Sequence, residues 1–209
     1  MKLAQKESEA ARLSRLHALR VLDTEPEPLF DALVRAASLV TGAPIALVSL
    51  VDTERQWFKS NFGLEEATET PRNVAFCAHA ILGEGLMEVP DARLDPRFAN
   101  NPLVIGEPGI RFYGGAPIAL SDGFKMGTLC VIDRQPRVLT DLQRNVLSEL
   151  ANAAAEALQQ RKLALEKSDA QTMQVEAERA FAKEHERHAN VIRATEVGTF
   201  EWNVVSGEV

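Results

Sequence analysis

The sequence predicts an α+β fold, in which an antiparallel sheet is flanked by helices and followed by one very long helix. Glycine and proline divide the chain, because all ten prolines and ten of the twelve glycines lie within residues 26–136. Short apolar segments separated by turn residues fill that region, as is typical of strands. Residues 137–197 contain neither glycine nor proline and are rich in Ala, Leu, Glu, Gln, Lys and Arg, which predicts one continuous helix.

The elements before the long helix follow from local patterns. Leucines recur at helical spacing in residues 8–22, and Gly42 ends a second predicted helix over residues 29–40. The apolar segment 44–52 shows little alternation, which predicts a strand covered on both faces. The later segments predict a strand over 56–60, a short helix capped by Asn73 and ending at Leu82, and a strand over 86–89. A long loop over 90–109 follows. The last two strands, 110–120 and 124–133, are predicted to form a hairpin that turns at Ser121-Asp122-Gly123. This order is not the alternation of a doubly wound parallel fold.

Composition excludes several classes of protein. Thirty acidic against 23 basic residues give a net charge of −7, so no electrostatic drive attracts the chain to nucleic acid or anionic lipid. The longest apolar run, residues 43–51, is less than half of the ~20 residues that a membrane span needs. The first residues lack the apolar segment of a secretory signal. We therefore expect a cytoplasmic protein with neither a nucleic-acid nor a membrane partner.

The long helix is expected to pair with a second copy of the chain. Thr140 and Gln143 form a capping box at its start, and helix from residue 141 to about 193 is too long to pack on one domain. Heptad spacing runs along it, but only about half of the seam is apolar, as its members show: Leu150, Ala154, Leu158, Arg161, Leu165, Ser168, Thr172, Val175, Arg179, Ala182, Glu186 and Ala189. An isolated helix of this kind is marginal in water, so we expect a parallel homodimer. A merely marginal, unpaired helix is the alternative.

Several motifs in order resemble one known family. They are Val21-Leu22-Asp23-Thr24, Arg55-Gln56-Trp57-Phe58-Lys59-Ser60, Phe76-Cys77-Ala78-His79-Ala80-Ile81, Asp91 with Asp95-Pro96-Arg97-Phe98, Arg111-Phe112-Tyr113-Gly114-Gly115-Ala116-Pro117 and Gly127-Thr128-Leu129-Cys130-Val131-Ile132-Asp133. Together they resemble a bacterial GAF domain of the type found at the N-terminus of sensor histidine kinases and diguanylate cyclases. The tail, in which residues 198–204 alternate like a strand, is similar to the opening of a PAS domain.

The resemblance implies a GAF sensory domain over residues 1–160, a coiled-coil linker helix over 161–193 and the start of a truncated PAS domain over 194–209. It implies a six-stranded sheet with helices on one face and a ligand pocket under loops on the other. It also implies sensing rather than catalysis, with a downstream PAS domain and a histidine kinase or diguanylate cyclase as output. Members of the family bind different ligands and some bind none, so the ligand is not implied.

The two cysteines are candidates for chemistry. Cys77 and His79 lie two positions apart, so on one helix their side chains diverge and cannot form a nucleophile pair directly. We interpret Cys77 and Cys130 as packed small apolar residues, because free cysteines are commonly buried. A GAF-fold enzyme of the free methionine sulfoxide reductase kind remains the alternative. Bilin and haem are not expected, since the spacing of Cys77 and His79 does not match a bilin attachment site.

Charged residues of the long loop are candidates for a ligand site. Asp91 and Asp133 each follow a strand and are expected to cap turns rather than bind a metal. Arg97 and Arg111 could each offer a planar fork to a carboxylate or phosphate, or Arg97 could pair with Asp91 or Asp95. An anionic or phosphate-bearing metabolite is the ligand expected from these arginines.

The predicted pocket gathers these groups on one side of the sheet. Two adjacent glycines beside Tyr113 would let a ligand or another backbone approach, with a bulge as the alternative. Trp57 is expected on an edge or outward face, packed against the first helix. The candidate ligand-binding residues are Phe76, Cys77, His79, Asp91, Asp95, Arg97, Phe98, Arg111, Phe112, Tyr113, Thr128 and Cys130. We expect a sensory module that transmits through a dimeric helix, with the reductase or a dimerisation module without ligand as alternatives.

Overall fold

The computed structural model describes residues 2–64 and 67–206. They divide between two compact units, residues 1–162 and 163–209. The elements are α1 (Lys2–Ala18), α2 (Pro28–Thr41), β1 (Ile45–Val51), β2 (Arg55–Phe62), β3 (Glu69–Pro71), the 3-10 helix η1 (Arg72–Val74), α3 (Phe76–Ala80), β4 (Met87–Val89), α4 (Pro102–Ile105), β5 (Phe112–Ala119), β6 (Lys125–Asp133) and α5 (Asp141–Ser206).

The first unit is built on one six-stranded antiparallel sheet with the strand order β3-β2-β1-β6-β5-β4. The two central strands are β1 and β6, and all seven residues of β1 are buried. The lack of alternation in the sequence of β1 thus reflects cover on both faces, as predicted. The predicted α+β class, with an antiparallel sheet, flanking helices and a long C-terminal helix, is confirmed.

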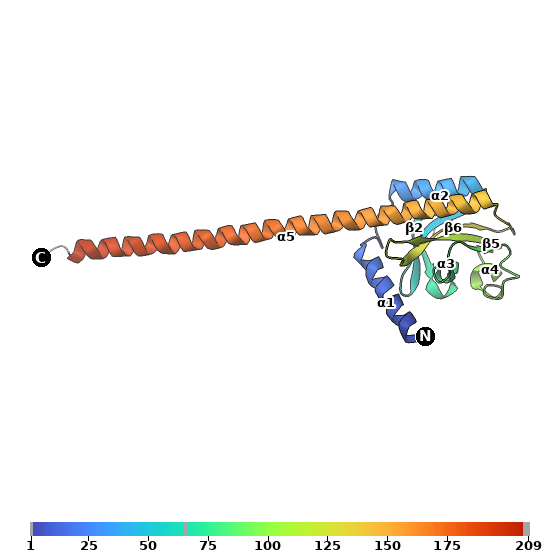
Figure 1. Ribbon diagram of the computed structural model, residues 1–209, viewed down its shortest axis with the longest axis horizontal. Helices are drawn as coiled ribbons and strands as arrows, with labels where there is room; N and C mark the ends of the chain where they lie inside the picture. Colours follow the sequence, from blue (N-terminus) through green and yellow to red (C-terminus); the bar gives the residue numbers. More distant parts are fainter. Residues whose placement is uncertain (1, 65–66, 207–209) are drawn as a thin grey trace. The chain divides into compact units, whose positions relative to one another are not determined.

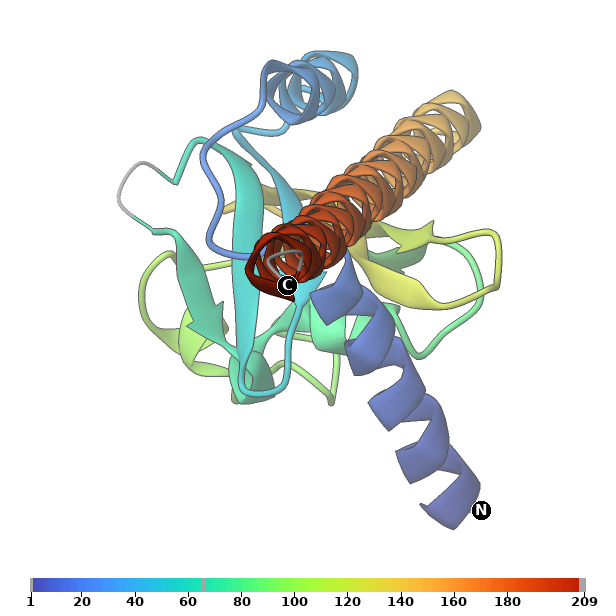
Figure 2. The same cartoon turned by 90° about the vertical axis from the view of Figure 1, so that its left-hand side faces the viewer.

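One face of the sheet is covered by α2, the first turns of α5 and the end of α1 (Figure 1). Figure 2 shows α2 on the same side of the strands as the gold start of α5. The cluster between them, here called the helix-side core, includes Phe30 and Val34 of α2 and Leu147, Ala154 and Leu158 of α5. Its strand residues are Ala46, Val48, Leu50, Trp57, Phe112, Ala116, Ile118, Met126, Leu129 and Val131.

The opposite face is covered by α3, α4 and the loops around them (Figure 1). The cluster on this face, here called the loop-side core, includes Phe76 and Cys77 of α3, Phe98 and Val104 of the long loop region, and Cys130 of β6. The predicted division into a helix-covered face and a loop-covered face is therefore what the sheet displays.

Some local predictions are confirmed. The backbone N–H of Thr140 donates to Gln143 Oε1 at 3.0 Å and that of Gln143 to Thr140 Oγ1 at 3.2 Å, which is the predicted capping box of α5. Pro28 begins α2, and Gly42 ends it in the left-handed conformation with φ of 65°.

Other local predictions are wrong. Asn73 lies in η1, and α3 begins after Ala75 without a side-chain cap. Trp57 is not on an edge, because β3 pairs with β2 outside it, but it does share the helix-side core with Leu16 and Leu19. The long loop contains α4, whose N-terminus is capped by Asn101. Both β3 and α4 are too short to show a period in the sequence.

The second unit contains the rest of α5. Residues 163–191 are exposed with the exception of Leu165, which is half-buried. The predicted strand over residues 198–204 is wrong, since these residues continue α5 to Ser206. Residues 207–209 of the predicted PAS segment lie outside the described residues. Among the helices that the structure describes, none combines the length and apolar character needed to cross a bilayer.

Candidate functional site

The loop-side core contains a cluster of hydroxyl and thiol groups at the centre of the sheet. Ser49 of β1 pairs in register with Thr128 of β6, and Gly115 of β5 pairs with Cys130. Side chains two apart on a strand share a face, so Thr128 and Cys130 both point toward α3. Cys77 of α3 lies against this part of the sheet, because its sulfur contacts Ser49 and Cys130.

The contacts within this cluster are close, and all five of its side chains are buried. The hydroxyl of Ser49 donates to Cys77 Sγ at 3.1 Å, and that of Tyr113 donates to the same sulfur at 3.3 Å. Thr128 Oγ1 lies 3.3 Å from Ser49 Oγ and 3.4 Å from the Tyr113 hydroxyl. The two sulfurs, Cys77 Sγ and Cys130 Sγ, are 3.8 Å apart. We call these five residues the thiol–hydroxyl cluster.

The cluster makes its two thiols unequal. Burial raises the pKa of Cys77, but hydrogen bonds from the neighbouring thiol and hydroxyl groups outweigh burial and lower this pKa to about 7. The contact with Cys77, together with burial, raises the pKa of Cys130 well above its ordinary value. Burial also raises the pKa of Tyr113, which keeps its hydroxyl proton for donation. Cys77 is thus the group that carries a thiolate most readily, and Cys130 keeps its proton.

The adjacent glycines serve the packing of neighbouring side chains. A Cβ added at Gly115 would overlap the Tyr113 hydroxyl oxygen, so the absence of a side chain there lets the tyrosine lie along its own strand. A Cβ at Gly114 would lie 3.0 Å from Leu139 Cδ1 on the opposite face. The close approach predicted from this glycine pair is therefore made by side chains of this chain. The space at Gly115 lets the Tyr113 hydroxyl reach Cys77.

Aromatic rings cover the cluster. Phe76 and Phe98 are stacked with ring centroids 4.0 Å apart and an interplanar angle of 13°. The Tyr113 ring lies 5.2 Å from Phe76, and the His79 ring meets Phe98 edge-on at 5.0 Å. Phe76 is 3% exposed and Phe98 is fully buried. These rings lie on the face of the sheet where the ligand pocket is predicted.

One candidate residue lies on the wrong face. Phe112 belongs to the helix-side core and not to the group that faces α3, and the same holds for the position of Gly114. The physical reason is the alternation of β5, which sends Tyr113 to one face and Phe112 to the other. The predicted convergence of Phe112 with Thr128 and Cys130 is therefore wrong.

The loop arginines have partners within the chain. Arg97 makes a two-pronged ion pair with Asp95, at 2.9 and 2.6 Å, which is the pairing offered as the alternative to ligand binding. This bond lowers the pKa of Asp95. Arg111 Nη1 donates to the carbonyl oxygens of Val104 at 2.7 Å and Ile110 at 3.1 Å. Arg97 and Arg111 thus stabilise the long loop and the segment that connects it to β5.

The candidate aspartates act as turn caps, as predicted. Asp91 Oδ1 accepts from the backbone N–H of Arg93 at 3.1 Å, and Asp133 Oδ1 accepts from that of Gln135 at 2.9 Å. Within the residues that the structure describes, no three His, Cys, Asp or Glu side chains gather as they would around a metal ion.

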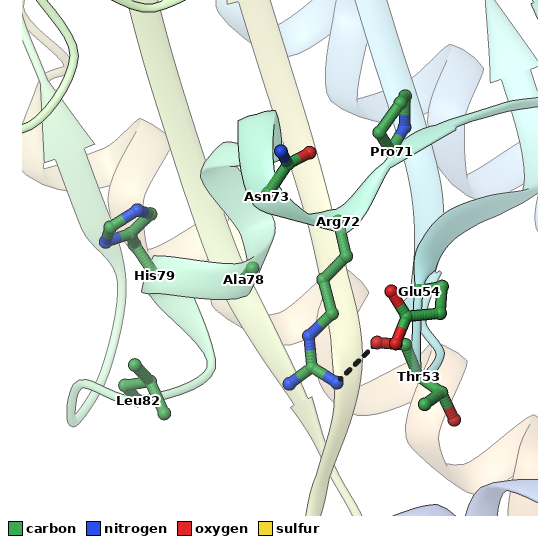
Figure 3. Close-up of a pocket in the computed structure, with 8 residues that line it drawn as sticks. All are labelled: Thr53, Glu54, Pro71, Arg72, Asn73, Ala78, His79 and Leu82. Carbon is green, nitrogen blue, oxygen red and sulfur yellow. Dashed lines mark hydrogen bonds between the residues drawn. The ribbon is translucent and has the colours of Figure 1, made fainter.

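An open cavity of about 620 Å³ lies beside α3 and was not foreseen from the sequence. Figure 3 shows Arg72 at its centre, between Thr53 and the α3 residues Ala78 and His79. The Arg72 guanidinium donates to the Asp52 carbonyl oxygen at 2.9 Å. The lining residues are Thr53, Glu54, Pro71, Arg72, Asn73, Ala78, His79 and Leu82. Partial burial and the charge of Arg97 lower the pKa of His79.

Sequence reasoning also missed Ser49 and the contact between the two cysteines. Ser49 is the one polar side chain in the buried strand β1, and that isolated hydroxyl was the available signal. The cysteines are 53 positions apart, so only the register of the sheet brings them together.

Comparison with known proteins agrees with this architecture. The model of the GAF domain family matches residues 25–158. A cyclic di-GMP phosphodiesterase of Pseudomonas aeruginosa is 49% identical over 131 residues, which are 63% of this chain and 22% of that relative. The chain therefore matches less than a quarter of the relative's length.

Solved structures share the fold. The GAF domain of a phosphoenolpyruvate-protein phosphotransferase from Acinetobacter superposes with a TM-score of 0.54 at 18% identity, over 73% of this chain and 93% of that one. A type II free methionine-R-sulfoxide reductase from Thermoplasma acidophilum gives 0.52 at 12% identity, over 62% and 89%. With the family match covering residues 25–158, more than half of the sequence, the chain belongs to the GAF domain family.

Proposed function

We propose that this GAF domain is the sensory input module of a bacterial signalling protein and that α5 carries its state to the rest of that protein. The continuity of α5 is the observation that supports this most strongly. The helix contributes Leu147, Ala154 and Leu158 to the helix-side core and continues as helix to Ser206. A change in sheet packing therefore acts on a helix that extends beyond the domain. A signal can act only by stabilising one of two states more than the other.

The output is proposed from the relative. The sequence resemblance favours a histidine kinase or diguanylate cyclase, whereas the 49% identical protein is a cyclic di-GMP phosphodiesterase. This match favours an output enzyme of cyclic di-GMP turnover over a kinase. The downstream PAS domain and the cytoplasmic location remain predictions.

We propose that α5 pairs in parallel with a second copy beyond Arg161. The first part of the predicted seam is used within the chain, because Ala154 and Leu158 are buried in the helix-side core. Farther along, the predicted seam residue Val175 is apolar and 44% exposed, so pairing would bury it. Pairing removes apolar surface from water and stabilises a helix that has little packing of its own.

Light scattering tests the pairing with two matched variants. V175D places a carboxylate on the seam of both copies, whereas A177D places the same charge two residues away on another face of α5. We expect V175D to raise the dimer dissociation constant about tenfold or more, which corresponds to about 1.4 kcal/mol. A177D is expected to leave it unchanged. Equal behaviour of the two variants, or a monomer at all concentrations of the parent chain, contradicts the pairing.

The ligand site is proposed on the loop-side face, with Arg97 and Arg111 at its rim and an anionic metabolite as ligand. A thermal-shift screen of anionic metabolites against the whole chain tests it. R97A is expected to lose the shift produced by a hit, and R93A is the matched control, since Arg93 pairs with Asp91 in the same loop. If both variants lose the thermal shift, or if neither does, the ligand does not bind at Arg97. R111A is less informative, because Arg111 also holds two backbone carbonyls.

The reductase alternative is disfavoured by burial. Cys77 is 2% exposed and Cys130 is fully buried, under the rings of Phe76 and Phe98. With both cysteines buried, this conformation offers methionine sulfoxide no exposed sulfur to react with.

A further inference from the structure

We propose that Cys77 and Cys130 form a reversible disulfide when the protein meets hydrogen peroxide, so that the thiol–hydroxyl cluster is an oxidative modification site. This goes beyond the sensory role proposed above and does not depend on the pairing of α5 or on a bound metabolite. It rests on the contact between two sulfurs brought together from α3 and β6.

The two sulfurs are already in van der Waals contact. They lie 3.8 Å apart, and a disulfide bond is about 2.05 Å long, so the sulfurs must approach by about 1.8 Å. Cys130 cannot move far, because β6 pairs with β1 on one side and β5 on the other. Cys77 can, because α3 has only five residues and no side-chain cap at its start. Oxidation is thus expected to draw α3 toward the sheet.

The surrounding hydroxyls prepare Cys77 as the nucleophile. Ser49 and Tyr113 both donate hydrogen bonds to its sulfur, at 3.1 and 3.3 Å, and these bonds favour the thiolate. The lowered pKa of Cys77 and the raised pKa of Cys130 agree with this division of roles. Cys130 is therefore the thiol that resolves the oxidised sulfur, and its proton leaves with the sulfenic oxygen.

The chemistry balances with hydrogen peroxide as the oxidant. The Cys77 thiolate attacks one peroxide oxygen, a sulfur–oxygen bond forms, the oxygen–oxygen bond breaks, and the leaving hydroxide takes up the proton that Cys77 had released, which gives water. Cys77 is now a sulfenic acid, oxidised by two electrons. The Cys130 sulfur then attacks Cys77 Sγ, the sulfur–sulfur bond forms, and the sulfenic oxygen leaves with the Cys130 proton as a second water. Two thiols and one peroxide thus give one disulfide and two waters.

An open cavity lies next to Cys77 in the chain, and we expect the oxidant to enter from it. Ala78, the residue after Cys77, lines the open cavity of about 620 Å³ on the outer side of α3 (Figure 3). A small local opening of this short helix exposes Cys77 to a molecule as small as hydrogen peroxide.

Intact mass spectrometry of the whole chain tests the proposal. After hydrogen peroxide, we expect the monomer mass to fall by that of two hydrogen atoms, both thiols to become unreactive toward iodoacetamide, and one proteolytic product to join the Cys77 and Cys130 peptides. Dithiothreitol is expected to reverse all three changes.

Two variants separate the roles of the cysteines. C130A is expected to accumulate a sulfenic acid on Cys77 that dimedone traps, whereas C77A is expected to leave Cys130 unmodified. Circular dichroism checks that both variants are folded. If either variant does not fold, the order of dimedone trapping in the unaltered chain, at Cys77 before any label at Cys130, carries the same information.

Three outcomes overturn the proposal. They are intact thiols under conditions that oxidise the chain unfolded in urea, sulfinic acids on both cysteines without a link, and a disulfide formed only between two chains.

Discussion

The ion-pair network around Glu27 offers a direct test of how the end of the GAF core is held together. Lys59 of β2 has a fully buried side chain, and its ammonium lies 2.7 Å from the Glu27 carboxylate. The same carboxylate lies 2.8 Å from the guanidinium of Arg161 on α5. Glu27, just before α2, therefore joins strand β2 of the sheet to the helix proposed to carry the signal.

The cost of removing Glu27 follows from these contacts. Each charge-assisted hydrogen bond contributes about 1.5–3 kcal/mol when buried. Glu27 is 38% exposed, so water replaces part of what its two bonds supply. Lys59 also keeps the Thr24 hydroxyl and the Glu25 carbonyl oxygen, each at 2.8 Å. We expect E27A to lose about 2–3 kcal/mol in the free energy of unfolding, which is a fall of about 5–10 °C in Tm.

The measurement is urea unfolding followed by circular dichroism, with E25A as the matched control. Glu25 is an exposed carboxylate in the same segment, and only its backbone carbonyl contacts Lys59. E25A is expected to change stability by no more than about 0.5 kcal/mol. The double variant E27A/K59M should be less destabilised than the sum of its single variants by about 1 kcal/mol or more, since the unpaired buried cation is gone. Equal stability of E27A and E25A, or strict additivity in the double variant, refutes the reasoning.

Three further predictions concern the sheet, the start of α5 and the long loop. A Cβ at Gly127 would overlap the Ser49 carbonyl oxygen across the β1–β6 pair, so we expect G127A to lower the free energy of unfolding by roughly 4 kcal/mol or more, or to prevent folding. The control is G83A, which lies in an open turn and should be tolerated. Expression and circular dichroism compare the two variants. T140A removes the hydroxyl that accepts from Gln143 and should cost about 1 kcal/mol in urea unfolding, and a change below about 0.3 kcal/mol would speak against the cap. The pKa of Asp95 is lowered by Arg97, so the stability it contributes is present above its unfolded pKa of about 3.9 and is lost as pH falls through the lower folded value. The Tm of D95N should therefore lie below that of the parent at pH 7, and the difference should shrink as pH falls below the unfolded pKa; a difference that does not change with pH would contradict the assignment.

The main elements could be predicted from sequence because their signals are local. The capping box at Thr140, the helix stop at Gly42 and the apolar run of β1 each lie within a few residues. The thiol–hydroxyl cluster could not be predicted, since its members come from β1, α3, β5 and β6 and meet only through register. The tail shows the opposite failure: residues 198–204 alternate like a strand, yet they are helical and continue α5 to Ser206.

The stacked rings over the thiol–hydroxyl cluster set a threshold for any molecule that binds on that face. A ligand that occupied the space of these rings would require Phe76 and Phe98 to separate, so its apparent affinity would be reduced by the free energy of that separation. If separation costs about 2.8 kcal/mol, apparent affinity falls about a hundredfold below the intrinsic value. Substitutions that weaken the stack are then expected to raise the apparent affinity although they do not contact the ligand. Abundant metabolites that bind weakly are expected not to occupy the unaltered domain.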